Sequence, residues 1–392
     1  MARELPFLMR TYHPPAISFV RGRGAYLFDH KGRRYLDFIS GLGVNVLGHC
    51  PPQLVRAVAE QANRLIHASN LYRMDLQVRL AKRLCEASFA DRVFFCNSGA
   101  EAIDTIIKAA RRHAWKRGDR RRRRVIAFEG SFHGRTYGAL SATHRPSVRE
   151  GFGPLLPGIA FARFNDPASV EALMDGRVCL ILVEPVLGEG GVVPATRSFL
   201  AGLRRLCDRH GALLALDEIQ CGLSRLGKPF AYQHYGVVPD LLALAKGLAG
   251  GLPMGAVLAR EPAASAFDPG THGATFGGNP WSCAAALVVC RKVLHPRFAK
   301  RVADMGRCLL ARLRERLANS PAVRDIRGIG LMIGIELHEP AAPYVEAARR
   351  RGLLINGTAE CVLRLLPPLI VTEQHCRTAA RIVGEIIGMR GQ

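Results

Sequence analysis

Two short apolar runs, each ending in charged side chains, constrain the fold of this chain more than any other feature. The first, ALLAL at residues 212–216, leads into Asp217 and Glu218, and the second, LLALA at residues 241–245, leads into Lys246. Unbroken apolar runs of this length are typical of strands that are buried on both faces of a parallel sheet. In open α/β sheets, ligands bind beyond the carboxyl ends of the strands. We therefore expect Asp217 and Lys246 to share one site.

The order of the other patterns favours an α/β fold. Short apolar runs at residues 93–96, 125–128 and 178–183 are typical of strands, and helical periodicity follows at residues 100–116 and 198–210. This alternation predicts a mainly parallel sheet with right-handed crossovers.

Three regions are predicted along the 392 residues, of which 48% are hydrophobic. Residues 1–45 contain short β-prone pieces between glycines and should form a meander that packs with a small domain. Residues 46–285 should form a large ligand-binding domain, and residues 286–392 a smaller α+β domain.

Composition also bears on compartment and partners. The first residues carry charge and proline, and no stretch reaches the roughly 18 apolar residues of a membrane span, so we expect a cytoplasmic protein without a membrane partner. The eleven cysteines include no C-x-x-C pair, so we expect no metal site.

The chain is strongly basic. It has 55 basic and 32 acidic residues, a formal net charge of +23, and five consecutive arginines at positions 120 to 124. Such a run could bind nucleic acid through its phosphates. We favour a solvated loop between a helix and a strand, because aromatic residues do not interleave with the arginines. Excess positive charge can also concentrate anionic substrates near a cleft.

Glycine-containing turns after the expected strands are suited to a phosphate. The sequence NSGAE at residues 97–101 opens a helix, where backbone N–H groups, the helix dipole and the Ser98 hydroxyl can hold an anion. The alternative is an ordinary N-cap, in which Ser98 serves only the helix. A glycine-dense segment at residues 271–280 also permits close approach of a phosphate.

Two more loops offer functional side chains. Phe132 could stack on a flat ring, His133 could form a hydrogen bond near it, and Arg135 could bind a carboxylate. The alternative is that Phe132 belongs to the core and Arg135 to a surface ion pair. Glu184 ends a third strand and Glu189 lies in the glycine-rich loop that follows, although both could be loop charges without a role.

A phosphate cradle, a stacking ring, a carboxylate and a lysine together indicate pyridoxal phosphate. Lys246 would form a Schiff base with it, and Asp217 would keep its pyridinium nitrogen protonated, so that the ring can act as an electron sink. Alone, Lys246 would be an ordinary solvated strand end. Agreement among independent features is the stronger criterion.

A series of short motifs also extends through nearly the whole chain. In chain order they are GRG at 22–24, YLDF at 35–38, LGH at 47–49, HASNLY at 67–72, NSGAEA at 97–102, SFHGRT at 131–136, EPV at 184–186, GEGG at 188–191, DEIQ at 217–220, AKG at 245–247 and RLLPPL at 364–369. With these motifs the chain resembles the class III aminotransferases of fold type I, especially the acetylornithine aminotransferases. The resemblance implies an α/β fold with a large domain that binds pyridoxal phosphate, a smaller α+β domain, and a homodimer with shared active sites.

The same resemblance implies roles at the cofactor. Lys246 would carry the Schiff base and, once released, move a proton between the substrate carbon and the cofactor carbon. Asp217 would pair with the pyridine nitrogen and Gln220 would hydrogen-bond the phenolic oxygen, with His133 nearby. The remaining cofactor contacts would be a stacked Phe132 and phosphate ligands at Ser98, Gly99, Ala100 and, from a neighbouring subunit, Thr275.

For substrates, the resemblance implies that Arg135 binds a carboxylate of the amino donor and that Arg364 binds the α-carboxylate of glutamate or 2-oxoglutarate. Glu189 would pair with Arg364 while a longer, diamine-type donor is bound, so that one site serves two kinds of substrate. Tyr12 and Glu184 are further expected substrate contacts.

The implied reaction moves the terminal amino group of N-acetylornithine, or a related ω-amino donor, to 2-oxoglutarate, within arginine biosynthesis. Other donors are ornithine, succinylornithine, acetyl-lysine, 4-aminobutyrate, diaminobutyrate and putrescine; the second hypothesis, from another class, is a nucleic-acid-binding protein that uses the arginine run. The chain departs from the family at Ala274, at Leu187 and at residues 103–105 and 224–227. These departures leave the donor open and do not touch Lys246 or Asp217.

Overall fold

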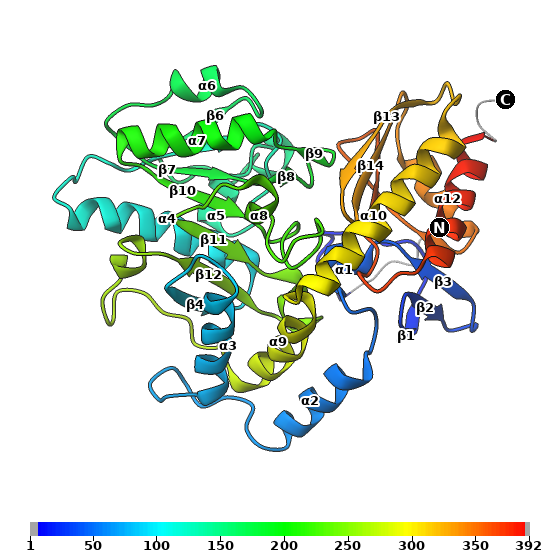
Figure 1. Cartoon of the computed structure of the whole chain (residues 1–392), viewed down its shortest axis with the longest axis horizontal. Coiled ribbons are helices and arrows are strands. Elements are labelled where there is room, and N and C mark those ends of the chain that lie inside the picture. The colour runs from blue at the N-terminus through cyan, green and yellow to red at the C-terminus, as the bar shows by residue number, and fades with distance from the viewer. Residues whose placement is uncertain (1–6, 389–392) are drawn as a thin grey trace.

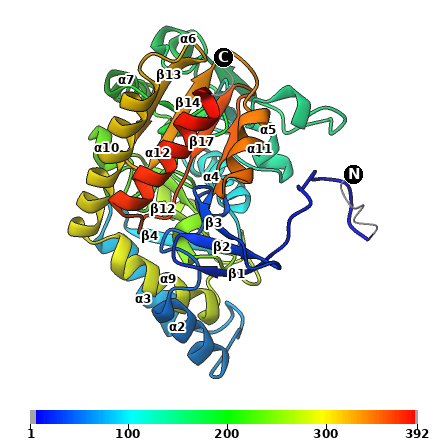
Figure 2. The ribbon, with the colours of Figure 1, turned by 90° about the vertical axis from the view of Figure 1, so that its right-hand side faces the viewer.

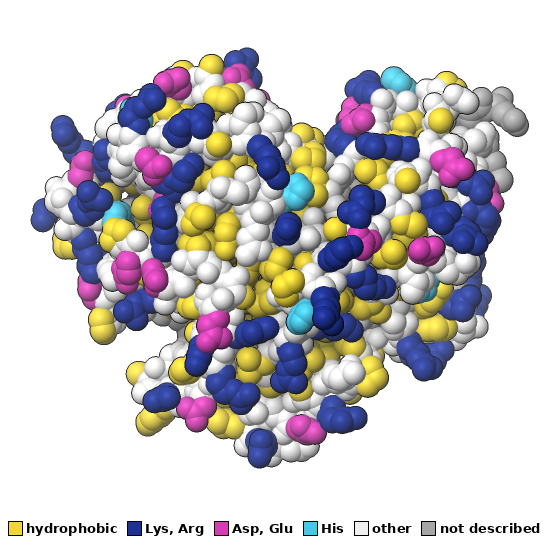
Figure 3. Space-filling view, in the orientation of Figure 1, with side chains coloured by type: hydrophobic (Ala, Val, Ile, Leu, Met, Phe, Trp, Pro, Cys, Tyr) yellow, Lys and Arg dark blue, Asp and Glu magenta, His cyan; other side chains and the backbone are white. Residues whose placement is uncertain are grey.

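The computed structural model describes residues 7–388, and these form two lobes (Figure 1). The larger lobe is built on a seven-stranded sheet, and the smaller on a four-stranded sheet covered by helices. A space-filling view of the same face shows a notch between the lobes at its upper edge, and Lys and Arg side chains spread over the whole face (Figure 3).

The large sheet is mainly parallel. Its strand order is β4 (Arg92–Cys96), β12 (Gly255–Ala259), β11 (Leu241–Leu244), β10 (Leu213–Asp217), β7 (Val178–Val183), β5 (Arg124–Phe128) and β6 (Ile159–Ala162). The pairs β11/β10, β10/β7, β7/β5 and β5/β6 are parallel. Only β12 is inserted antiparallel, between β11 and β4. The predicted strands agree with those observed to within about a residue at each end, which is the usual uncertainty of such boundaries.

Both faces of this sheet are buried, which explains the unbroken apolar runs. On β10, Leu213 and Ala215 belong to one hydrophobic cluster with helix α4 (Gly99–Lys116). Leu214 and Leu216 belong to a second cluster with α7 (Arg197–His210). Since successive side chains of a strand point to opposite faces, each face of β10 has its own helical cover.

The smaller lobe has the sheet order β13 (Val323–Ile329), β14 (Met332–Leu337), β17 (Val362–Leu365) and β16 (Asn356–Thr358). Its helices are α10 (Pro296–Leu317), α11 (Ala342–Arg350) and α12 (Glu373–Gly388). The N-terminal meander of β1 (Phe19–Arg23), β2 (Tyr26–Asp29) and β3 (Arg34–Asp37) gains a fourth, parallel strand, β15 (Leu353–Leu354).

The meander is thus completed by a strand from the C-terminal part of the chain. The region bounds 1–45, 46–285 and 286–392 stay predictions.

Figure 2 shows the segment that precedes β1 running away from the body of the molecule. The remaining elements are α1 (Ser40–Gly43), α2 (Pro52–Ala62), α3 (Asp75–Glu86), α5 (Tyr137–Ser141), α6 (Pro167–Glu171), α8 (Tyr232–Tyr235), α9 (Pro280–Val293), β8 (Val186–Leu187), β9 (Val193–Pro194) and the 3₁₀ turns η1 (Pro146–Val148), η2 (Lys246–Ala249) and η3 (Ala263–Ala266).

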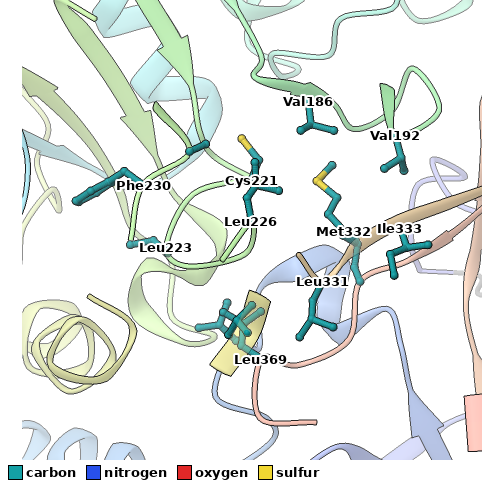
Figure 4. Packing of buried hydrophobic residues seen from close by; sticks show 14 of the residues in the cluster. Val186, Val192, Cys221, Leu223, Leu226, Phe230, Leu331, Met332, Ile333 and Leu369 are labelled. Carbon is teal, nitrogen blue, oxygen red and sulfur yellow. The ribbon is translucent and has the colours of Figure 1, made fainter. Parts of the chain in front are cut away.

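A hydrophobic junction fixes the two lobes together beside the strand ends (Figure 4). Leu223 and Leu226, from the loop after β10, belong to the same buried cluster as Leu331 and Met332 at the start of β14. Met332 also reaches the loop after β7, because its Cε would lie 3.5 Å from a Cβ placed on Gly188. The junction therefore sets the small-lobe strands against the large sheet.

Within residues 7–388 there is no helix with the length and hydrophobicity needed to cross a bilayer.

Candidate active site

The ends of β10 and β11 bring Asp217 and Lys246 to the wall of one cavity of about 430 Å³. The strands are parallel neighbours, with Asp217 in register with Ala243, so Lys246 follows at the same edge of the sheet. The volume is that of an ordinary small-molecule site. Most residues singled out in the sequence line this cavity: Ser98, Gly99, Ala100, Phe132, His133, Arg135, Glu184, Glu189, Asp217, Gln220 and Lys246.

Lys246 has an unusual backbone and a perturbed amine. Its φ of 41° lies in the left-handed region, where a non-glycine residue is uncommon, and such strain is concentrated at functional sites. Burial lowers the pKa of its amine, and the positive charge of Arg364 lowers it further, whereas Asp217 acts in the opposite direction. A lysine of this kind gives up its proton more readily than an exposed one.

Asp217 is held by hydrogen bonds at both carboxylate oxygens. Its Oδ2 lies 2.7 Å from Nδ1 of His133, and its Oδ1 accepts from the backbone N–H of Ile219 at 3.0 Å. The backbone N–H of His133 donates to the Thr143 hydroxyl at 2.9 Å. Among the described residues, the buried His133 Nε2 has no hydrogen-bond partner. The carboxylate is thus fixed in position and faces the cavity.

The first turn of α4 forms both a helix cap and an anion cradle. The Ser98 hydroxyl accepts from the Glu101 N–H at 3.2 Å, and the Glu101 carboxylate accepts from the Asn97 N–H at 2.6 Å. This reciprocal cap is the alternative weighed for Ser98. It leaves the N–H groups of Gly99 and Ala100 without intrahelical partners at the positive end of the helix. A Cβ on Gly99 would lie 2.7 Å from Ile219 Cδ1, so a larger residue here would require the Ile219 side chain to shift.

Glu184 ties two loops of the cavity together. Its Oε1 accepts from the Phe132 N–H at 2.9 Å and its Oε2 from the Gly188 N–H at 3.1 Å. Burial raises the pKa of Glu184 to about 7, and the nearby His133 works against this rise. In this structure Glu184 therefore anchors backbone, and contact with substrate stays a prediction for it.

Arg364 lies behind the cavity wall in a buried ion pair. Its side chain is 1% exposed, and its Nη1 lies 2.6 Å from Glu189 Oε1 and 3.1 Å from Gln220 Oε1. The Thr358 hydroxyl holds the Glu189 backbone by donating to its carbonyl at 2.7 Å. Arg135 is exposed, and its guanidinium lies 5.8 Å from the centre of the Phe132 ring. A solvent-facing arginine thus lines the cavity, and a neutralised one lies behind its wall.

Two of the singled-out residues lie elsewhere. Tyr12 is 83% exposed, Thr275 is also exposed, and neither lines the cavity. Their roles stay predictions. Conversely, Val44, Asn97, Ile219 and Met254 line the cavity without having been expected to do so. Asn97 and Ile219 lie inside the quoted motifs, but apolar Val44 and Met254 carry no local signal.

Two places where the sequence departs from the family pattern, Thr105 and Ala274 in the segment 271–280, lie in parts of the chain that contact each other. The Thr105 hydroxyl donates to the Glu101 carbonyl and lies 2.9 Å from Nε2 of His272, while the Lys108 amine lies 2.8 Å from the other ring nitrogen. Because the hydroxyl proton is already used, His272 Nε2 is the donor to Thr105. Thr105 therefore helps to hold the glycine-dense segment against α4. Among residues 7–388, no group of three or more His, Cys, Asp or Glu could hold a metal ion.

Comparison with known proteins places this site in a family. The model of the family described as "Aminotransferase class-III" matches residues 7–387. The chain belongs to this family. The predicted α/β fold of type I is confirmed, because solved structures similar to this class III aminotransferase are aminotransferases too.

Relatives cover essentially its full length. The acetylornithine aminotransferase of Aquifex aeolicus is 45% identical over 384 residues, which are 98% of this chain and 100% of that one. The crystal structure of N-acetylornithine aminotransferase from Stenotrophomonas maltophilia matches with a TM-score of 0.85 and 36% identity, over 97% of both chains. Ornithine aminotransferase from Toxoplasma gondii has a TM-score of 0.94 and 32% identity, over 98% of this chain and 93% of that one.

Class III aminotransferases depend in general on pyridoxal phosphate, and the residues of this aminotransferase fit that group. The free N–H groups at the start of α4 suit its phosphate, and the fixed carboxylate of Asp217 suits its ring nitrogen. The lysine with a lowered pKa suits its aldehyde. The site also contains a buried ring nitrogen, His133 Nε2, that lacks a partner among the described residues.

Proposed function

We propose that this aminotransferase binds pyridoxal phosphate through Lys246 and Asp217 and moves the terminal amino group of N-acetylornithine to 2-oxoglutarate, giving an aldehyde and glutamate. The observation that carries the proposal is the convergence of Asp217, Lys246 and the Glu189–Arg364 pair on one cavity. The donor is supported by acetylornithine aminotransferases, which reach 45% identity in the Aquifex enzyme against 32% for the Toxoplasma ornithine enzyme.

Proton transfer falls to Lys246. The cofactor supplies an electron sink when it is bound. Burial and Arg364 lower the pKa of the lysine, so its Nζ gives up its proton more readily than that of an exposed lysine. The released amine would take a proton from the substrate carbon that bears the terminal amino group and hold it at Nζ for return within the same site. Asp217 stays in position because His133 and the Ile219 N–H hold its two oxygens, and its negative charge favours a protonated ring nitrogen.

Two substrates can use one site because Glu189 neutralises Arg364 and can be displaced from it by a substrate carboxylate. When the amine end of N-acetylornithine is bound, no substrate carboxylate lies near Arg364, and Glu189 neutralises the arginine. When 2-oxoglutarate is bound, its α-carboxylate takes the place of Glu189 on Arg364. Exposed Arg135 is free to bind the distal carboxylate in both cases. Glu189 and the substrate α-carboxylate would therefore alternate as the partner of Arg364.

A homodimer with shared active sites is part of the proposal. Thr275 is exposed and lies outside the cavity of its own chain, which suits a contact with a second chain. Large apolar side chains nearby are also exposed: Leu65 45%, Ile66 55%, Leu71 87%, Tyr72 72% and Phe276 59%. Such exposure is typical of a surface that another subunit covers. Cytoplasmic location and a place in arginine biosynthesis stay predictions.

The visible spectrum of the purified protein tests the cofactor, and single-turnover assays test the donor. N-acetylornithine should convert the bound cofactor to its amine form faster than ornithine, succinylornithine, acetyl-lysine, 4-aminobutyrate, diaminobutyrate or putrescine. A colourless protein that takes up no pyridoxal phosphate would remove the basis of the proposal. Conversion by ornithine alone would keep the aminotransferase and replace the donor.

Mixed dimers test the shared site. Chains with Lys246→Ala and chains with Thr275→Ala should each give impaired homodimers. In a mixed dimer, the chain that keeps Lys246 receives an intact Thr275 from the other chain, so one site per dimer should recover. Activity that stays at the average of the two homodimers would contradict the sharing of sites.

A further inference from the structure

A second concavity lies at the other end of α4, away from the catalytic cavity. Its volume is about 450 Å³, and six cationic side chains line it: Lys108, Arg111, Arg112, Arg120, Arg122 and Arg123. We call it the arginine pocket. Asp119 is the only acid among the lining residues of the arginine pocket. The arginine pocket and the catalytic cavity have no lining residue in common. The arginine run of the sequence thus forms part of a concave surface.

The helix and the loop contribute separately to this surface. Lys108, Arg111, Arg112 and Trp115 follow one another at helical spacing and share one face of α4. The opposite face is buried against the sheet. Arg120, Arg122 and Arg123 come from the loop between α4 and β5, which is where the sequence predicted a loop. Cations near the C-terminus of a helix interact favourably with the helix dipole. This effect explains some of the cations on α4, but it does not explain the arginines of the loop.

Some of these cations are neutralised within the chain. Arg122 Nε lies 3.0 Å from Asp119 Oδ2, and Arg112 Nη2 lies 2.8 Å from Asp268 Oδ2. A neighbouring arginine of the run, Arg124, pairs with Asp175 at 2.7 Å at the start of β5. Part of the run therefore has a purely structural use.

The other cations of the pocket have no acidic partner within residues 7–388. Arg111 donates to the carbonyls of Arg123 and Pro157, and Arg123 donates to the carbonyl of Arg120. The Arg120 guanidinium lies 5.6 Å from the centre of the Trp115 ring. The Lys108 amine lies 2.8 Å from Nδ1 of His272, and its charge interacts with the Asp104 carboxyl without forming an ion pair. Carbonyl and ring contacts orient these groups and do not neutralise their charges.

Uncompensated like charges around one concavity favour an anion with several charges. A pocket of this volume accommodates a small molecule. Orthophosphate offers a single anionic centre, whereas linked phosphates can meet helix and loop cations together. The pocket offers a nucleobase little surface for stacking. Its largest aromatic side chain, the half-exposed Trp115, already has the guanidinium groups of Arg112 and Arg120 at 5.5 and 5.6 Å from its ring centre.

We propose that the arginine pocket binds a small molecule that carries two or more linked phosphates. Such a group occurs in inorganic pyrophosphate and tripolyphosphate and in nucleoside di- and triphosphates. The site is independent of the catalytic cavity, so the proposal does not depend on which amino donor the enzyme uses.

Calorimetric titration of the holoenzyme at low salt tests this site. The ligands are orthophosphate, pyrophosphate, tripolyphosphate and ATP. We expect one site per chain, with affinity that rises from orthophosphate to tripolyphosphate and falls steeply with added salt. If tripolyphosphate and ATP bind equally, the phosphates alone are recognised; if ATP binds more tightly, the nucleoside contributes.

A double variant and a matched control locate the binding. Arg120→Ser with Arg123→Ser should weaken tripolyphosphate binding at least about tenfold, because each charge-assisted contact contributes more than a neutral one. Arg205→Ser with Arg209→Ser removes the same charge from exposed positions on α7, on the other face of the sheet, and should leave the affinity unchanged.

Three results would overturn the proposal. The first is no saturable binding at millimolar ligand, and the second is an equal loss of affinity in both double variants, which would indicate net charge alone. The third is an oligonucleotide that binds more tightly than tripolyphosphate and loses that affinity in the Arg120→Ser, Arg123→Ser variant, since the run would then serve nucleic acid. Transamination by this variant should match that of the unaltered enzyme, because neither arginine lines the catalytic cavity.

Discussion

The two ends of α4 border two concavities of similar volume, about 430 and 450 Å³, that treat charge in opposite ways. In the catalytic cavity, groups from distant parts of the chain meet in pairs: Glu189 forms an ion pair with Arg364, and His133 a hydrogen bond with Asp217. In the arginine pocket, cations that are close in sequence crowd together, and most of them lack an acid among the described residues.

The difference follows from burial. A buried charge such as that of Arg364, whose side chain is 1% exposed, is costly unless it is paired, so the fold must supply its partner at a defined place. Among the unpaired cations of the arginine pocket, Lys108, Arg120 and Arg123 are exposed, so water and salt screen their charges. The half-buried Arg111 instead donates hydrogen bonds to two backbone carbonyls. Paired, buried charges therefore define a reaction geometry, whereas unpaired, exposed charges define only a preference for anions.

The largest expected effect is that of Lys246→Ala. In the proposed function Lys246 joins the cofactor and moves the proton, so kcat of the variant should fall by about 10³-fold or more. The measurement is steady-state transamination together with the visible spectrum, which should lose the absorbance of the lysine-bound cofactor. Folding should be retained, as circular dichroism can check. Near-normal turnover would show that the paired cavity is not the reaction centre.

Glu189→Gln should change specificity more than stability. The substitution leaves the buried charge of Arg364 without its counter-charge, which should favour donors that bring a carboxylate. We expect the kcat/KM ratio of N-acetylornithine to glutamate to fall about 30-fold, equivalent to about 2 kcal/mol.

The matched control is Glu385→Gln, which removes the partner of Arg381 in an exposed pair at 2.5 Å on α12. An exposed pair contributes at most about 1 kcal/mol to stability, and this one lies outside the cavity, so the ratio should not change. Equal effects of the two variants would remove the distinction between buried and exposed pairs.

Glu184 should make stability depend on pH. Its pKa is raised from 4.5 to about 7 by burial, so between these values the folded state holds a proton that the unfolded state has lost. Its contribution to the free energy of unfolding is therefore complete below about pH 4.5 and is lost as the pH rises through 7.

Urea unfolding of the unaltered protein and of Glu184→Gln between about pH 5 and 8 measures this contribution. The variant does not titrate at this position, so lowering the pH from 8 to 5 should shift the difference between the two free energies by about 2 to 3 kcal/mol in favour of the unaltered protein. A difference that is independent of pH would mean that Glu184 is ionised in the folded state throughout this range.

The smallest expected effect is that of Arg120→Ser with Arg123→Ser on stability. Neither arginine has an acidic partner among the described residues, so the free energy of unfolding should change by less than about 0.5 kcal/mol without added anion. With tripolyphosphate in excess, thermal unfolding should occur at a higher temperature in the unaltered protein only. A large loss of stability without anion would reclassify the run as structural.

Much of the fold could be predicted from local patterns. Strands β10 and β11 were predicted because a strand covered on both faces must be continuously apolar. Strand β12 was missed, although Gly255–Ala259 is as apolar as its neighbours. It follows a glycine-rich turn and enters the sheet antiparallel between β11 and β4, and local periodicity does not report which strand lies beside which.

The candidate active site likewise contains contacts that local patterns predict and contacts that depend on how distant segments pack. Asp217 and Lys246 could be placed at one edge because strand ends of a parallel sheet meet there. The contact between Arg364 and Gln220, and the presence of Val44 in the cavity wall, depend on how the small lobe and the meander pack on the sheet. For Glu184 the sequence suggested substrate, whereas the structure adds two backbone N–H groups that no spacing could have revealed.

The parallel pairing of β3 with β15 has a consequence for biosynthesis. Residues 34–37 are among the first made by the ribosome, while Leu353 and Leu354 are among the last. Every strand of the seven-stranded sheet is synthesised before β15 exists. The emerging protein therefore carries an unfinished sheet edge through most of translation, and such edges are prone to pair with other chains. The β3 edge therefore stays open to pairing with other chains until residues 353–354 have been made.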